Sequence, residues 1–189
     1  MVLKQMNKMQ QIIIYPTDTA YALGCDARDQ EAAERVFEIK GRSQSKTLPL
    51  IAADVAMVRQ WCTLAGQAKK LADKYWPGPL TLVLPVKLEG LSPAVINKGS
   101  VAIRVPGNKI ARHLSQEIGA PLISTSANKS GDKNLYSLAE VRASLGEAMN
   151  KVDYVIDAGA LPSQGVSTVV KVCDNEIDII RQGEIEIKA

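Results

Sequence analysis

The stretch Lys40-Gly-Arg-Ser-Gln-Ser-Lys-Thr-Leu-Pro49 joins a helical pattern on one side to a strand pattern on the other. Before it, Asp29 offers an N-cap to a helix that runs to about Ile39. After it, Leu48–Ala53 is a short apolar run typical of a buried strand. A helix that leads directly into a strand favours an α/β fold.

The same stretch carries the cations Lys40, Arg42 and Lys46, with Ser43 and Ser45 between them. An irregular segment can turn several cations toward one point, and guanidinium and ammonium groups both bind phosphate oxygens. A solvated basic loop explains the spacing equally well. The stretch alone therefore leaves both interpretations open.

Apolar runs and helical patterns mostly alternate along the rest of the chain, and strands dominate toward its end. Strands are predicted at 12–15, 21–25, 48–53, 80–86, 101–105, 121–124, 154–156, 168–172 and 177–180. Helices are predicted after Asp29, Asp54 and Ser137, and around Ala68–Tyr75 and Ile110–Ile118. We expect an α/β domain built on a twisted mixed sheet flanked by helices, with residues 1–11 as a flexible lead-in and 12–189 as a single domain.

The composition narrows the class of protein. Hydrophobic residues make up 46% of the chain, enough for a sizeable core, and the net charge is only +3. This charge suits an anionic small molecule or RNA and is too small for a polybasic nucleic-acid arm. Three cysteines far apart, without a CxxC pair, favour a reduced compartment. Neither a signal peptide nor a run of membrane-spanning length is present, so we expect a cytoplasmic protein with no membrane partner.

Polar clusters follow several of the predicted strands. They are Thr17-Asp18-Thr19, Arg104, and Ser124-Thr125-Ser126-Ala127-Asn128. The carboxyl ends of strands border the ligand crevice of open α/β sheets, although each cluster alone also fits a turn or a helix cap. Arg104 can point outward on a polar face or inward to hold a carboxylate. His113 is the only histidine, so a histidine-based triad or a histidine-rich metal site is not expected.

Several motifs in a fixed order carry a family resemblance. They are Tyr-Pro-Thr-Asp-Thr-(x)-Tyr-(x)-Leu-Gly at 15–24, Lys-Gly-Arg at 40–42 with Ser45-Lys46, Trp-Pro-Gly-Pro-Leu-Thr at 76–81, Ala-Ile-Arg-Val-Pro at 102–106, Ser-Thr-Ser-Ala-Asn at 124–128, Ser167-Thr168-Val169 and Ile180-Arg181-Gln-Gly183. In this order the chain resembles the YrdC-type threonylcarbamoyl-AMP synthases, in their short, single-domain form.

The resemblance implies a YrdC-like fold with a large, concave, basic cavity. It implies an enzyme that condenses L-threonine, bicarbonate and ATP to threonylcarbamoyl-AMP and pyrophosphate, a nucleotidyl transfer that feeds the t6A modification of tRNA. ATP would be a substrate and would bring Mg2+ with it, without a metal site made by the protein. tRNA and the t6A transferase proteins are the implied partners.

The resemblance also assigns residues. Lys40, Arg42 and Lys46 would face the triphosphate as the catalytic cations. The further positions implied on the nucleotide side are Ser100, Ser126, Asn134 and Arg181. The positions implied on the threonine side are Thr19, Arg104, Ser124 and Ser167.

Two other functions remain compatible with these residues. One is a non-catalytic RNA-binding or ribosome maturation factor of the same fold, which would need neither Arg104 nor the Ser and Thr hydroxyls. The other is a relative that transfers carbamoyl groups in metallocentre maturation, usually within a much longer chain. The chain also departs from the family, because only about eleven residues precede Ile12 where a helix is usual, and Ile51 stands where longer forms often have His.

Overall fold

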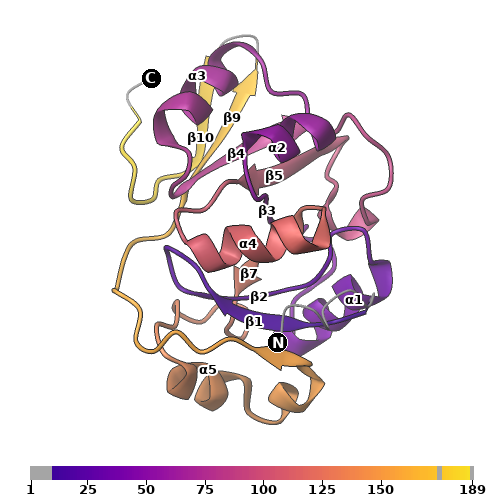
Figure 1. Ribbon diagram of the computed structural model, residues 1–189, viewed down its shortest axis with the longest axis vertical. Helices are drawn as coiled ribbons and strands as arrows, with labels where there is room; N and C mark the ends of the chain where they lie inside the picture. The colour runs from indigo at the N-terminus through magenta and orange to yellow at the C-terminus, as the bar shows by residue number, and fades with distance from the viewer. Residues whose placement is uncertain (1–9, 174–175, 188–189) are drawn as a thin grey trace.

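The strands of the computed structural model, which describes residues 10–173 and 176–187, form two sheets and not the single sheet expected. One sheet has four strands in the order β7-β2-β1-β8, and the other has six in the order β10-β9-β4-β5-β3-β6. Figure 1 shows the six-stranded sheet in the upper part of the molecule and the four-stranded sheet in the lower part. The predicted α/β class with mixed sheets is confirmed, and the expectation of one sheet is wrong.

The four-stranded sheet is built on β1 (Ile13–Pro16), all of whose residues are buried. Its neighbour β2 (Tyr21–Gly24) pairs with it antiparallel, after the short Thr17–Ala20 turn. The short strands β7 (Thr125–Ser126) and β8 (Tyr154–Val155) complete the two edges. A strand buried on both faces requires the continuous apolar run that the sequence has there.

The six-stranded sheet is centred on an antiparallel pair, β4 (Leu80–Pro85) and β5 (Ser100–Arg104). On one side β3 (Leu50–Ile51) runs parallel to β5, and β6 (Leu122–Ile123) runs antiparallel to β3. On the other side β9 (Thr168–Cys173) runs parallel to β4, and β10 (Glu176–Arg181) forms the outer edge. Strand β3 is shorter than the predicted 48–53 because only two of its residues pair.

The helices begin where the sequence predicts caps. Asp29 caps α1 (Gln30–Lys40) and Asp54 caps α2 (Val55–Trp61). Ser137 and Glu140 form a capping box on α5 (Leu138–Leu145). The remaining helical segments are α3 (Gly66–Tyr75), α4 (Lys109–Ile118), η2 (Pro93–Val95) and η3 (Gly146–Lys151).

The two sheets meet where the chain passes from β6 to β7 across one residue, Ser124. Helix α4 covers this junction, because Ala111 and Leu114 pack in one cluster with Ile13 of β1 and Ile51 of β3. Gly24 of β2 lies against β6 of the other sheet, and a Cβ there would come within 1.8 Å of the Ile123 carbonyl oxygen. Only glycine therefore allows the two sheets to approach this closely.

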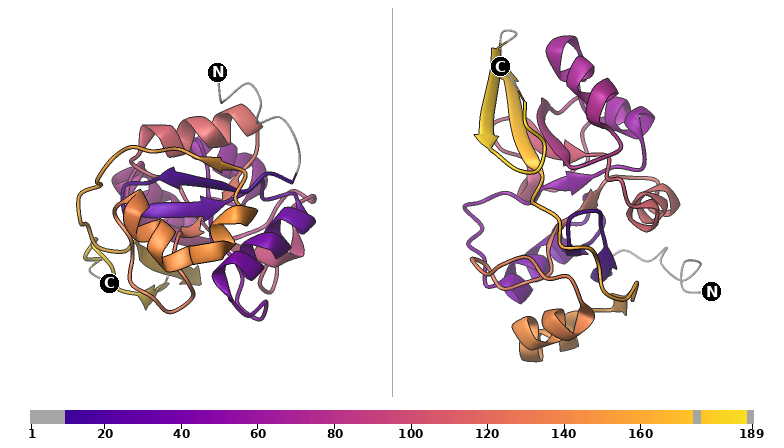
Figure 2. Two further views of the ribbon diagram at one scale, coloured as in Figure 1. Left: turned by 90° about the horizontal axis from the view of Figure 1, so that it is seen from below. Right: turned by 90° about the vertical axis from the view of Figure 1, so that its left-hand side faces the viewer.

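The segment between β8 and β9 runs along one side of the molecule, from the lower sheet to the upper one (Figure 2). Most of the predicted lead-in over 1–11 lies outside the described residues. Of the part that is described, Gln10 donates its backbone N–H to the Asp29 carboxylate. Within 10–173 and 176–187, no helix is long and apolar enough to cross a membrane.

Candidate functional site

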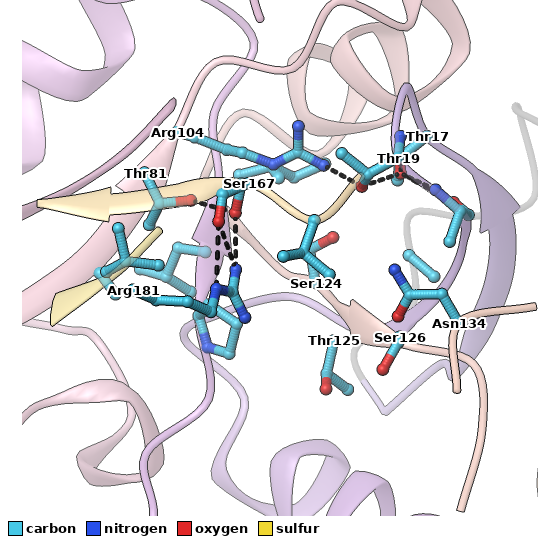
Figure 3. A pocket seen from close by; sticks show the side chains of 18 of the residues that line it. Thr17, Thr19, Thr81, Arg104, Ser124, Thr125, Ser126, Asn134, Ser167 and Arg181 are labelled. Carbon is cyan, nitrogen blue, oxygen red and sulfur yellow. Dashed lines mark hydrogen bonds between the residues drawn. The ribbon is translucent and has the colours of Figure 1, made fainter. Parts of the chain in front are cut away.

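A pocket of about 440 Å³ lies at the junction of the two sheets. The volume falls in the range of ligand-binding clefts, roughly 300–1,000 Å³. Side chains from both sheets and from the connecting segments line it (Figure 3). The lining residues are Thr17, Thr19, Ala20, Tyr21, Ala22, Arg42, Thr47, Pro49, Leu50, Ile51, Thr81, Ala102, Arg104, Ser124, Thr125, Ser126, Asn134, Val166, Ser167, Val169, Ile180 and Arg181.

Arg104 ends β5 with its side chain turned into the molecule, where it lines the pocket. Its Nη1 donates to Asp18 Oδ1 at 2.7 Å, and its Nη2 donates to Thr19 Oγ1 at 3.1 Å. The two side chains of the ion pair are only 8% and 15% exposed, so water screens their attraction weakly. The sequence left the direction of Arg104 open, and this pair fixes it inward.

Arg181 occupies another side of the pocket at the end of β10. Its Nη2 donates to the Ser167 carbonyl at 2.8 Å and to Ser167 Oγ at 2.9 Å. Ser167 Oγ also lies 2.9 Å from Thr81 Oγ1, so the three side chains form one chain of hydrogen bonds (Figure 3). Burial, and then the positive charge of Arg104, lower the pKa of Arg181.

Positive charge is in excess in the pocket. Three of the described lining residues, Arg42, Arg104 and Arg181, are cations, and none is Asp or Glu. Asp18 compensates one of them from behind the lining. Arg42 bonds the Thr47 carbonyl at 3.0 Å, and Arg181 bonds Ser167. Because neutral acceptors leave the charge of a guanidinium uncompensated, the pocket favours an anionic ligand.

Hydroxyl groups and one amide form the rest of the polar lining. Ser124 lies in the middle of the close-up, and Ser126 lies beside Asn134 (Figure 3). Ser126 Oγ donates to Asn128 Oδ1 at 2.7 Å. These groups give the pocket uncharged donors and acceptors that can bind ribose, phosphate or amino-acid oxygens.

The structure brings eight of the residues expected at the site into this pocket. They are Thr19, Arg42, Arg104, Ser124, Ser126, Asn134, Ser167 and Arg181. Their individual roles stay predictions.

Three of the expected site residues lie outside the described lining. Lys46 is exposed in the basic loop. Ser100 lies at the start of β5, on the same face as Ala102 and Arg104, because side chains alternate along a strand. Four residues at about 3.3 Å each separate it from Arg104 by roughly 13 Å. The assignments of Lys46 and Ser100 to the nucleotide stay predictions, and both require a ligand that extends beyond the pocket.

The third, Lys40, is not among the residues that line the pocket. The residue is 2% exposed, and its Nζ donates to the carbonyl and Oδ1 of Asn128 at 2.8 and 2.9 Å and also to the Ser126 carbonyl. Burial, and then the charge of Arg42, lower the pKa of Lys40 to about 8. A helix C-terminus directs this side chain inward, although the surrounding sequence is polar.

Sequence reasoning assigned no role to Asp18 or Thr81. Both stood within quoted motifs, at 15–24 and at 76–81, and only their partners show what they do. Among the described residues, no group of three or more His, Cys, Asp or Glu could hold a metal ion.

Comparison with known proteins identifies the class of protein that this fold and pocket define. A profile of the Sua5/YciO/YrdC family, described as "Telomere recombination", matches residues 5–183. The chain belongs to this family. Among its relatives, the threonylcarbamoyl-AMP synthase of Idiomarina loihiensis is 34% identical over 170 residues, which are 88% of this chain and 89% of the relative.

Solved structures agree with this family. P. abyssi Sua5 complexed with L-threonine matches with a TM-score of 0.85 and 30% identity, over 96% of this chain and 54% of that one. E. coli YciO matches with a TM-score of 0.83 and 27% identity, over 98% and 92%. The chain thus spans about half the length of P. abyssi Sua5 and nearly all of YciO. The predicted YrdC-like fold is confirmed.

Proposed function

We propose that this chain is a threonylcarbamoyl-AMP synthase, an enzyme that condenses L-threonine, bicarbonate and ATP to threonylcarbamoyl-AMP and pyrophosphate. The observation that carries the proposal is the pair Arg104 and Asp18 at the pocket. This ion pair holds the Arg104 guanidinium at the wall of the pocket, which also contains hydroxyl groups and two further arginines. The curated relatives and the threonine complex of P. abyssi Sua5 support this catalytic function over a non-catalytic RNA-binding factor.

The threonine side of the pocket would be the one that contains Arg104. A guanidinium has five N–H donors, of which Asp18 and Thr19 each engage one. The remaining donors can bind the carboxylate of the amino acid. Ser124 and Ser167 line the same cavity and can form hydrogen bonds with the other polar atoms of the amino acid.

The nucleotide side would be the one formed by Arg42, Arg181, Ser126 and Asn134. Once the threonine amine has captured bicarbonate or CO2, a carbamate oxygen attacks the α-phosphorus, and the bond from that phosphorus to the pyrophosphate oxygen breaks. Negative charge then grows on the phosphoryl oxygens and on the departing pyrophosphate. Fixed cations stabilise such charge without a protein nucleophile, and this makes the reaction a nucleotidyl transfer.

Mg2+ would enter with the nucleotide. The described lining offers Ser and Thr oxygens and no carboxylate, so the residues of the pocket do not make a dedicated site for the ion. Mg2+ commonly keeps several waters and binds through substrate phosphates, which is compatible with such a lining.

The product would serve the t6A modification of tRNA, with tRNA and the t6A transferase proteins as partners in the cytoplasm. The buried thiols Cys25 and Cys62 are compatible with a reducing compartment. A net charge of +3 offers few phosphate contacts, so we expect weak tRNA binding that declines steeply with salt.

The direct test is product detection. The purified chain is incubated with ATP, Mg2+, bicarbonate and L-threonine, and threonylcarbamoyl-AMP is sought by mass spectrometry alongside pyrophosphate release. Reactions without threonine or without bicarbonate serve as controls. Pyrophosphate that appears without threonine, or tight tRNA binding with no adenylate, would refute the proposal.

A further inference from the structure

The buried ammonium of Lys40 lies at the centre of a hydrogen-bond network next to the pocket. An ammonium has three N–H donors, and three acceptors surround this one: the Ser126 carbonyl, the Asn128 carbonyl and Asn128 Oδ1. The donors of Lys40 are therefore fully used within the protein. To contact a phosphate, Lys40 would have to break one of these bonds and leave a position where it is 2% exposed.

Asn128 extends the network to the far end of the same loop. Its Nδ2 donates to the carbonyls of Asp132 and Lys133, both at 2.8 Å. The backbone N–H of Ser130 donates to the Lys40 carbonyl at 2.9 Å. Lys40 at the end of α1 and Asn128 thus together hold the loop over residues 126–134 from within.

This loop presents two of the lining side chains. Ser126 lies at its start and Asn134 at its end. Two backbone hydrogen bonds with Tyr21 hold the loop near its two ends. The Ala127 N–H donates to the Tyr21 carbonyl at 2.9 Å, and the Tyr21 N–H donates to the Leu135 carbonyl at 3.0 Å. Between these two points, Lys40 and Asn128 hold the loop from inside the protein, and Ser144 of α5 accepts a hydrogen bond from the Lys129 N–H at 3.2 Å.

We propose that Lys40 is a positioning residue, which acts on the nucleotide through the 126–134 loop and not by contact with the phosphates. This inference rests on the proposed function for the identity of the nucleotide. It separates the two cations of the Lys-Gly-Arg motif: Arg42 lines the pocket and meets the ligand, whereas Lys40 shapes the 126–134 loop.

The two roles predict different dependence on the number of phosphates. A cation that contacts the triphosphate favours ATP over AMP, so its loss weakens ATP binding selectively. A residue that positions Ser126 and Asn134 supports the part of the nucleotide that AMP and ATP share. Its loss should weaken both nucleotides by the same factor.

The test measures AMP and ATP affinity by calorimetry, with Mg2+ present, for the wild type, Lys40→Met and the matched control Arg42→Met. We expect Lys40→Met to weaken AMP and ATP by the same factor, because it releases the loop that carries Ser126 and Asn134, and Arg42→Met to weaken ATP more than AMP. Hydrogen exchange over 126–135 should rise in Lys40→Met and stay unchanged in Arg42→Met. This second measurement needs no nucleotide.

A selective loss of ATP affinity in Lys40→Met, or unchanged exchange in the loop, would overturn the inference. Asn128→Ala provides a second variant in case Lys40→Met does not fold, because it keeps the charge of Lys40 and removes the amide that joins Lys40 to the carbonyls of Asp132 and Lys133. We expect it to weaken AMP and ATP equally, and wild-type affinity for both would refute the positioning role. The proposed function alone would be refuted if the wild type bound neither nucleotide while its 126–134 loop was protected from hydrogen exchange and lost that protection only in Lys40→Met.

Discussion

Replacing Arg104 by Gln removes the guanidinium that we assign to the threonine carboxylate. A hydrogen bond to a charged group contributes about 1.5–3 kcal/mol, and each ~1.4 kcal/mol is a factor of ten in affinity. Loss of one such bond should weaken threonine binding roughly 10- to 150-fold. ATP binding should remain, because Arg42, Ser126 and Asn134 are unchanged.

The same substitution also has a folding cost, which must be separated from binding. Breaking a buried ion pair costs about 3–5 kcal/mol, and we expect the lower end because the Asp18 side chain is 15% exposed. Asp18 Oδ2 is a buried atom without a hydrogen-bond partner even in the intact pair, so Asp18 tolerates the loss of Arg104 poorly. The double variant Asp18→Asn/Arg104→Gln removes the stranded charge and should recover much of this stability.

The assay compares four proteins, the wild type, both single variants and the double variant. Threonine affinity comes from pyrophosphate release at saturating ATP and bicarbonate, ATP affinity from calorimetry, and the free energy of unfolding from urea titration. The double variant should regain stability but not threonine affinity. Recovery of threonine affinity in the double variant, or loss of ATP binding in Arg104→Gln, would refute the assignment of Arg104 to the threonine carboxylate.

Three further predictions follow from other parts of the structure. The enzyme should prefer threonine to serine, since the methyl group of threonine is worth about 1–3 kcal/mol of binding. It should prefer serine to valine, because valine leaves the hydrogen-bond partner of the hydroxyl unpaired. Equal rates of pyrophosphate release with the three amino acids would contradict this order. Gly24→Ala should destabilise the fold by about 3 kcal/mol or more, because its Cβ would lie 1.8 Å from the Ile123 carbonyl oxygen. The control Gly107→Ala, whose Cβ would have no contact below 3.4 Å, should change the free energy of unfolding little; both are measured by urea titration. The pKa of Lys40 lies at about 8 in the folded protein and at 10.5 ordinarily, so between these values the unfolded chain holds the extra proton, and the wild type should gain stability with pH relative to Lys40→Met. The difference between the two stability curves should grow by about 3 kcal/mol, and parallel curves would show the shift to be wrong.

Local sequence determined most of the secondary structure. The apolar run at Ile12–Tyr15 and the caps at Asp29, Asp54 and Ser137 place a strand and three helices within a residue or two of where they lie. Each of these signals acts over a few residues, through alternation, helical periodicity or a side chain that bonds a nearby N–H. The order of the motifs along the chain was likewise enough to indicate the family.

Only the tertiary structure decided which way the charged side chains point. Arg104 turns inward because Asp18 lies opposite it, and the two are 86 residues apart in the chain. Lys40 points into the protein because Asn128, 88 residues further on, accepts a hydrogen bond from its ammonium. Neither partner can be read from the residues around the cation.

The division into two sheets is also a tertiary decision. The sequence predicts a strand that breaks near Ser124, but it cannot say that the chain changes sheets there. That change depends on the close approach of Gly24 and the Ile123 carbonyl and on α4 packing over both sheets. Pairing between strands is set by contacts between distant segments, whereas the patterns of a sequence report only what each segment requires of its own surroundings.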